Sequence, residues 1–198
     1  MKKVVFALIL LSVAEVSFSQ DEKMQFIRKG LLRSTATFAI GGITKIALHS
    51  NLEYYLADNV SLRGSSFLSL KMFDPNEEGF LDYGPYLSSN HQILSGGFYH
   101  FKTRNHFDPY LGLQPGVSVS QAIVYRGGGE NTYSKTAVNP IIGATLGFNL
   151  YFQKFFHLFG ETHYVHGKHL SDIYQPVSLD ELRFSFGLGF NINTLKKK

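Results

Sequence analysis

The sequence predicts an all-β chain that is exported and then folds into an eight-stranded, antiparallel, up-and-down transmembrane β-barrel. Three observations predict this fold: an N-terminal signal peptide, segments in which apolar and polar residues alternate, and connections that are short and long in turn. The composition agrees, because 18 Phe, 11 Tyr and 19 Gly accompany little helical periodicity.

The start of the chain has the pattern of a cleaved signal peptide. Two lysines precede an apolar run over 4–13, and the small residues Ser17 and Ser19 indicate cleavage after Ser19. A retained anchor is the weaker alternative, because a spanning helix needs about 20 apolar residues. We therefore expect a signal peptide over 1–19 and an outer-membrane β-barrel domain over 20–198.

Cysteine content and net charge exclude disulfide bonds and give no support to nucleic-acid binding. The chain has no cysteine, so no disulfide can stabilise the exported domain. Its net charge of +4 is mild, and the one basic cluster is the three lysines at 196–198. Nucleic-acid binding is therefore not expected.

Alternation with a period of two is clearest near the end of the chain. Bulky apolar residues at even positions of 182–192 share one face of a strand, and Gly, Ser, Asn and Arg183 share the other. The pattern recurs in earlier segments, although residues 93–101 are bulky on both faces and leave the fourth strand ambiguous. The expected strands span 30–40, 44–56, 60–72, 91–103, 109–123, 138–152, 156–167 and 180–192.

The connections between these strands differ in length. The short ones, 57–59, 104–108 and 153–155, are rich in turn-forming residues. Apart from a short first hairpin, those at the other end are long and polar: 73–90, 125–137 and 167–179. Outer-membrane barrels have short periplasmic turns and longer outward loops, so this alternation sets the expected orientation.

Residue size indicates which face points outward. An eight-stranded barrel has a narrow interior, which Gly, Ser and paired charges would fill. The bulky face would be a very large apolar patch if it met water. A soluble barrel has the opposite arrangement. Because an isolated buried charge is costly, we predict an interior polar network that plugs the barrel. Its predicted members are Arg33, Glu53, Arg63, Glu161, His163 and Arg183.

Three stretches carry a family resemblance. Residues 53–64 read as a strand–turn–strand hairpin, 109–113 as the start of a central strand, and 185–192 (Ser-Phe-Gly-Leu-Gly-Phe-Asn-Ile) as a C-terminal assembly signal. Together they resemble the small outer-membrane β-barrel family of the OmpA/OmpX type, in the porin-family form found among Bacteroidetes-like bacteria. The resemblance spans essentially the whole mature chain.

This resemblance implies a place and a set of partners. The place is the outer membrane of a Gram-negative bacterium. The partners are outer-membrane lipid, lipopolysaccharide and the barrel-assembly machinery, with an unknown surface ligand as a further possibility. Residues 193–198 follow the signal, whereas family members usually end on its last hydrophobic residue. The signal residues would be Ser185, Gly187, Phe190 and Ile192.

No pattern predicts a catalytic, cofactor or metal site. The run His163, His166, His169 matches neither the alternation of a strand nor a zinc spacing. The glycines at 127–129 lack the Gly-Lys-Ser/Thr ending of a phosphate loop.

One segment faintly resembles the active site of outer-membrane lipid A deacylases. It spans 163–167, but Val165 stands where those enzymes have a nucleophilic serine. Ser171 or Ser178 could replace that serine only in a rearranged loop. No enzymatic reaction is therefore expected, and no cofactor.

Aromatic residues near the strand ends are expected to form interfacial girdles, as in other membrane barrels. The expected function is a plugged outer-membrane barrel that acts in envelope integrity or in surface interaction through its outward loops. The alternatives are a lipid A-modifying enzyme, a narrow passive channel and a soluble calycin-like binder. The expected girdle residues are Tyr99, Phe101, Tyr110, Tyr151, Phe152, Phe155, Phe156 and Tyr164.

Overall fold

A computed structural model describes most of the expected barrel domain. The described residues are 28–73, 85–101, 103, 106–124, 132–152, 154–170 and 176–194. The predicted signal peptide and more than half of the connections 73–90 and 125–137 lie outside these ranges, as do residues 171–175 of the connection 167–179. Within the ranges, no helix is long and apolar enough to cross a bilayer.

Eight long strands form the wall, close to the spans that the alternation predicts. The largest difference is the fourth strand, which begins at Pro85 rather than at 91. The strands are β1 (Leu31–Gly41), β2 (Ile46–Ala57), β3 (Val60–Lys71), β4 (Pro85–His100), β5 (Phe107–Val124), β7 (Ala137–Tyr151), β8 (Phe156–His169) and β10 (Glu181–Asn193), with short strands β6 (Thr132–Tyr133) and β9 (Val177–Ser178).

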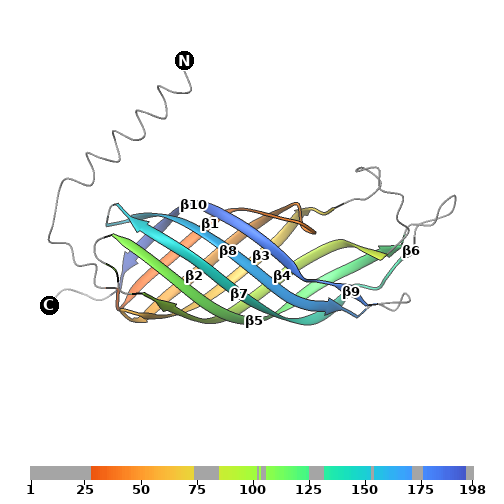
Figure 1. Ribbon diagram of the computed structural model, residues 1–198, viewed down its shortest axis with the longest axis horizontal. Helices are drawn as coiled ribbons and strands as arrows, with labels where there is room; N and C mark the ends of the chain where they lie inside the picture. The colour runs from red at the N-terminus through yellow and green to blue at the C-terminus, as the bar shows by residue number, and fades with distance from the viewer. Residues whose placement is uncertain are drawn as a thin grey trace, which may run out of the picture.

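The sheet closes on itself. Each long strand pairs antiparallel with the next, and β10 pairs with both β8 and β1. Figure 1 shows the resulting barrel from the side, with β6 and β9 at the end that carries the long connections. Closure pairs both edges of each of the eight long strands described, so the backbone polar groups of the wall pair with one another, as they must in lipid.

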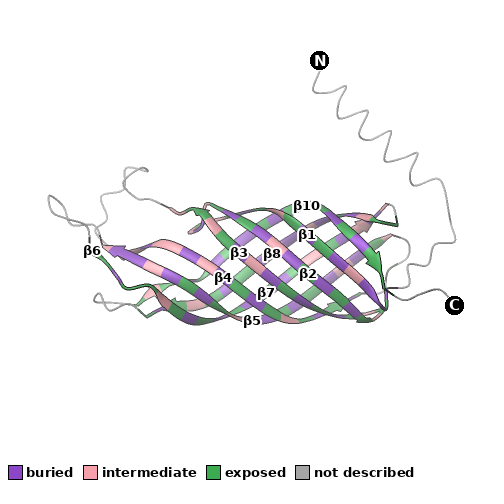
Figure 2. Cartoon of the chain, turned by 180° about the vertical axis from the view of Figure 1, so that it is seen from behind, coloured by how far each residue is buried: buried purple, intermediate pink, exposed green. Residues whose placement is uncertain are grey.

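The apolar face points outward, as predicted. Buried and exposed residues alternate along every long strand, which gives the banded pattern of Figure 2. Phe186 on β10 is 76% exposed, whereas Arg63 on β3 is 1% exposed. The soluble calycin-like alternative is therefore wrong, because it needs the apolar residues inside.

The ambiguous fourth strand follows the same rule. Leu94 and Phe98 point into the barrel, and Ile93 and Tyr99 point outward. Both faces are bulky because this strand supplies apolar volume to the interior as well as to the outer surface. The guanidinium carbon of Arg63 lies 3.9 Å from the centre of the Phe98 ring, so the inward ring packs against a charge.

The girdle prediction is wrong for two of its tyrosines. Tyr110 and Tyr151 are each 1% exposed and lie in the interior. Each sits at an inward position of its strand, and its hydroxyl bonds to a buried carboxylate. Tyr99, Phe101, Phe155 and Tyr164 are exposed, as expected for girdle residues; Phe152 and Phe156 are partly exposed.

A charge on the outer face tests this orientation. Phe186→Arg, near the middle of β10, should lower the free energy of unfolding in lipid vesicles by about 2 kcal/mol or more, because a cation near the bilayer centre costs about 2–4 kcal/mol. The chain has no tryptophan, so denaturant unfolding is followed by the gel mobility of unboiled samples. Phe186→Leu is the control. Equal stability of the two variants would show that this face does not meet lipid.

Candidate functional site

The barrel interior is charged but balanced. Within the described ranges, the buried ionic side chains comprise four arginines and four carboxylates, and they contribute equal numbers of positive and negative charges. Balance matters because a buried charge is tolerated only when it is paired and hydrogen-bonded. These residues are Arg28, Arg33, Arg63 and Arg183, with Glu53, Asp108, Glu161 and Glu181.

Glu53 lies at the centre of this group. Strand register places Arg33 of β1 and Arg63 of β3 directly opposite it, one on each side. Arg63 donates to Oε2 of Glu53 from Nε at 3.0 Å and from Nη2 at 2.8 Å, and Arg33 donates to the same oxygen from Nη2. Three adjacent strands are therefore joined by one carboxylate in addition to their backbone hydrogen bonds.

A second carboxylate connects opposite walls. Glu161 on β8 accepts from Nη1 of Arg63 at 2.8 Å and from the Tyr110 hydroxyl at 2.9 Å. Nε2 of His49 lies 3.4 Å from its other oxygen. Because Arg63 and Glu161 stand on strands that are not neighbours, their contact bridges the lumen.

A third carboxylate, Asp108, organises the interior near the short turns. It accepts from Arg28 at 3.0 Å, and from the hydroxyls of Tyr55 at 3.0 Å and Tyr151 at 3.1 Å. Asn149 donates to it at 3.0 Å. The predicted turn 104–108 includes Asp108, whereas this residue belongs to β5 and is fully buried.

Two predicted members of the network form hydrogen bonds with groups other than Glu53 and Glu161. Arg183 on β10 donates to Glu181 from Nε at 2.8 Å and to Gln92 from Nη1 at 2.7 Å. His163 also faces the interior, where its Nδ1 is 2.6 Å from the Thr145 hydroxyl. The interior thus holds ionic groups at different depths, with those of Glu53, Glu161 and Asp108 nearer the short turns and that of Glu181 nearer the outward end.

Sequence reasoning missed several buried ionic or polar members, among them Asp108, Glu181, Arg28 and His100. A signal for the first was present, because residue 108 shares its parity with Tyr110, Gly112 and Gln114 on the inward face. Glu181 likewise shares the inward face with Arg183. Only the assembled barrel shows which of these positions contact one another.

Ser61, His100 and Asp108 have the sequence of contacts found in a hydrolase triad. The Ser61 hydroxyl lies 2.9 Å from Nε2 of His100, and Nδ1 of His100 lies 3.0 Å from Asp108. However, Ser61 donates to Glu53, and the same Nε2 is 2.9 Å from Glu53. All three side chains are fully buried. His100 is thus placed to bridge two carboxylates, and no substrate reaches the hydroxyl.

The three histidines of the run on β8 point in different directions. His163 and His169 face inward, and Nδ1 of His169 is 2.9 Å from the Ser120 hydroxyl. His166 faces outward and lies 2.8 Å from Asp180. The pKa of the Asp180 carboxyl is below its usual value, mainly because it accepts from the Gly167 backbone amide and also because His166 is close. Nowhere in the described part of the chain do His, Asp and Glu side chains gather in a set that could hold a metal ion.

Glycine on the inward face makes room for the large polar side chains. A Cβ atom added to Gly147 would lie 2.6 Å from the Tyr110 ring and 2.8 Å from the Cβ of Glu161. Any side chain at this position would therefore displace Glu161, which accepts from Arg63, or Tyr110, which donates to Glu161. This explains why small residues alternate with bulky ones in the strand sequences.

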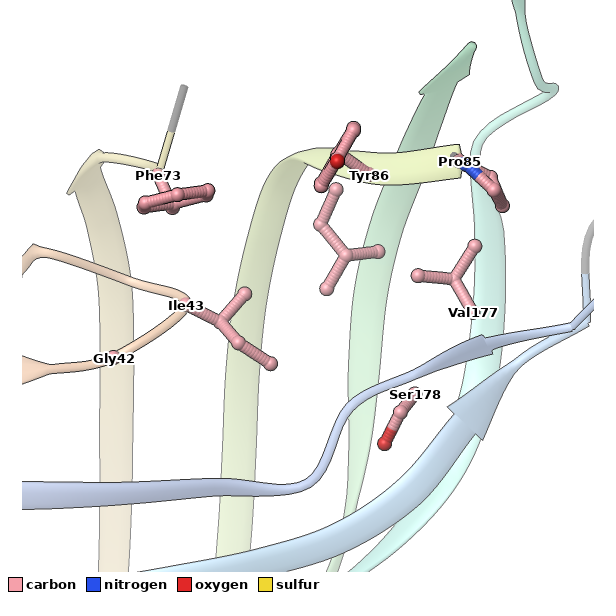
Figure 3. Close-up of a pocket in the computed structure, with 8 residues that line it drawn as sticks. Gly42, Ile43, Phe73, Pro85, Tyr86, Val177 and Ser178 are labelled. Carbon is pink, nitrogen blue, oxygen red and sulfur yellow. The ribbon is translucent and has the colours of Figure 1, made fainter. Parts of the chain in front are cut away.

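The outward half of the lumen combines the Arg183–Glu181 ion pair with apolar packing. A buried cluster there includes Phe67, Leu94, Leu87 and Leu179 from four different segments. Above it, a cavity of about 290 Å³ opens between the first hairpin, the ends of β3 and β4, and β9. Figure 3 shows Ile43, Phe73, Tyr86 and Val177 around this space.

The sequence matches no protein-family profile and no curated protein sequence. Solved structures with the same architecture do exist. The outer membrane protein OprG of Pseudomonas aeruginosa superposes with a TM-score of 0.58 at 12% identity, covering 85% of this chain and 98% of that one.

Two further structures agree. The N-terminal β-barrel domain of Pseudomonas aeruginosa OprF gives a TM-score of 0.53 at 16% identity, over 83% of this chain and 98% of that one. Ail, the attachment invasion locus protein of Yersinia pestis, gives 0.50 at 10% identity, over 83% and 99%. At these identities the likeness establishes the fold: a small, closed barrel of the outer-membrane type.

Removing the central carboxylate charge tests the interior network. Glu53→Gln removes the carboxylate charge that Arg33 and Arg63 share, so buried positive charge is left without a full counter-charge. The free energy of unfolding in lipid vesicles should therefore fall by about 3–5 kcal/mol. The matched control is Asp180→Asn, which removes a carboxylate from an exposed pair worth at most about 1 kcal/mol. Both are measured by denaturant titration. If the two variants lose the same small amount, the buried group contributes no more than a surface pair.

Proposed function

We propose that the protein is a non-enzymatic barrel of the Gram-negative outer membrane that acts in envelope integrity. The observation that supports this role most directly is the contact between Arg63 and Glu161, which ties opposite walls together across the lumen. With Glu53 it makes the interior a set of crosslinks rather than a passage. Such a barrel resists deformation and fills bilayer area without opening it.

The proposed location follows from the outer face and the fold. A closed wall with an apolar exterior needs lipid around it. The resemblance to OmpA/OmpX-type barrels, including the Bacteroidetes-like form, belongs to this proposal, as does delivery by the barrel-assembly machinery. For that delivery, Phe190 and Ile192 of the C-terminal signal lie exposed on the outside of β10, and Ser185 lies inside.

A second role, presentation of the outward loops to a surface partner, is favoured by the length of strands β4 and β5. β4 and β5 are the longest strands described, with 16 and 18 residues, and β6 extends the pairing of β5 further. These two strands border the connections between β3 and β4 and between β5 and β7. The chemistry of a partner would depend on loop residues outside the described ranges.

A strain that lacks the gene tests the proposed role. Loss of the barrel should raise entry of large antibiotics that an intact outer membrane excludes, while the lipid A acylation pattern, measured by mass spectrometry, stays unchanged. Complementation with the wild-type chain should restore the barrier, and Phe186→Arg serves as the poorly inserting control. Altered lipid A acylation would instead indicate the enzymatic alternative. Unchanged entry with loss of a surface interaction would favour the loop-presenting role.

The channel alternative is tested separately. In planar bilayers the wild-type barrel should give no discrete conductance steps, because Arg63, Glu161 and Glu53 cross the lumen and the cluster around Phe67 fills it nearer the outward end. Insertion is verified in the same samples by gel mobility of the folded band. Reproducible steps from verified, inserted barrel would contradict the closed lumen and favour a narrow channel.

A further inference from the structure

A cavity lies at the outward end of the lumen, and three separate parts of the chain bound it. The first hairpin supplies Gly42 and Ile43, the start of β4 supplies Leu87, and β9 supplies Val177 and Ser178. In Figure 3, the side chains of Ile43 and Val177 point into the space between these parts. Its volume of about 290 Å³ is close to the lower end of the range for ligand pockets, about 300–1,000 Å³.

Aromatic rings form one side of this cavity. The ring centres of Phe73 and Tyr86 are 6.4 Å apart, within the distance at which aromatic rings contact each other. The backbone N–H of Phe73 donates to the carbonyl of Ile43 at 2.8 Å, which ties this side of the cavity to the first hairpin. Contacts within the chain therefore hold the wall in place.

The first hairpin is also fixed from inside the barrel. Thr44, directly after Ile43, donates its backbone N–H to Glu181, and its hydroxyl accepts from Arg183 at 3.3 Å. Thr44 is fully buried. This attachment favours binding, because a pocket whose walls are already in place loses less conformational entropy with a ligand than one that must form around it.

The buried apolar cluster closes the floor of the cavity. Leu87 belongs to both, and Ile43 and Val177 pack against the cluster. Toward the middle of the barrel, Phe67 and Leu94 of the same cluster are each 1% exposed. The cavity is therefore a pocket with a closed end, and not the mouth of a passage through the barrel.

The lining of the pocket favours an uncharged, apolar ligand. Among the described residues around it, none is Asp, Glu, Lys, Arg or His. A charged group would therefore lose its water without gaining a counter-charge, which is costly. An apolar cavity of about 150 Å³ can bind one benzene ring. A space of about 290 Å³ thus has room for about ten to twelve carbon atoms.

We propose that this pocket binds a small uncharged apolar molecule of about ten to twelve carbon atoms, such as a medium-chain alcohol, with its hydrocarbon part against Ile43, Leu87 and Val177. The ligand enters from the outward end and stays there, because the cluster beneath the pocket stops it from passing through the lumen. This binding goes beyond the proposed envelope role and does not depend on it, since only the folded barrel is needed.

Photo-crosslinking of the purified, folded barrel in detergent tests this proposal. A decanol that carries a diazirine on its chain should label residues around Ile43, Leu87 and Val177 saturably, as mapped by mass spectrometry of peptides. Excess unmodified decanol should prevent the labelling. The potency of competing alcohols should rise about fourfold per methylene from pentanol to decanol. Beyond dodecanol it should level off, because longer chains extend out of the filled pocket.

A charge placed inside the pocket is compared with the same charge outside it. Val177→Asp should weaken competition by decanol at least about tenfold, because an apolar chain cannot solvate the carboxylate. The matched control is Val138→Asp on the outward part of β7, where the side chain is 66% exposed and lies outside the lining. This control should bind decanol as the wild type does. Gel mobility of unboiled samples checks the folding of both variants.

Three outcomes would overturn the proposal. Labelling that spreads over the outer wall and does not saturate would show partition of the probe into detergent. Potency that keeps rising beyond dodecanol would show that no closed pocket limits the chain. Equal competition by decanol in the two folded variants would remove the pocket from the binding. The first two measurements use the wild type alone, so they decide the matter even if Val177→Asp does not fold.

Discussion

The carboxylate of Glu53 between two guanidinium groups is the interaction on which the interior depends. Three strands bring Arg33, Glu53 and Arg63 to one level by register, and Arg63 continues to Glu161 on the far wall. In a low-dielectric interior, each of these charges would be costly alone. Their mutual pairing makes a charged lumen compatible with a membrane-embedded wall, and Gly147 leaves the space in which it forms.

The lumen and the outer wall carry different kinds of side chain. Inside, the groups built on Glu53, Glu161 and Asp108 lie toward the short turns, and the Arg183–Glu181 pair lies with the apolar cluster toward the outward mouth. Outside, apolar side chains cover the middle, and lysines such as Lys45 and Lys71 stand at the outward edge. Ser61 and His100, which resemble parts of a catalytic triad, both contact the buried carboxylate of Glu53. Features that could meet a partner therefore lie on the lipid-facing wall and at the outward end.

The fold was predictable because alternation and loop length report directly on a closed sheet. Strand spans agreed to within a few residues except at β4, where an inward bulky face at Leu94 and Phe98 obscured the period. Site geometry was less accessible. Residue type favours a turn for Asp108 and an interfacial girdle for Tyr110, but it is a weaker guide here than parity along the strand. Parity places both inside.

The amino-acid sequence by itself determined which residues face lipid and which face the lumen, since side chains of a strand alternate and only one face is uniformly apolar. It could not determine which inward residues meet. Contacts such as Arg63 with Glu161, or Arg183 with Gln92, depend on strand register and on closure between β10 and β1. Those relations exist only when the whole ring has formed, because they join strands distant in sequence.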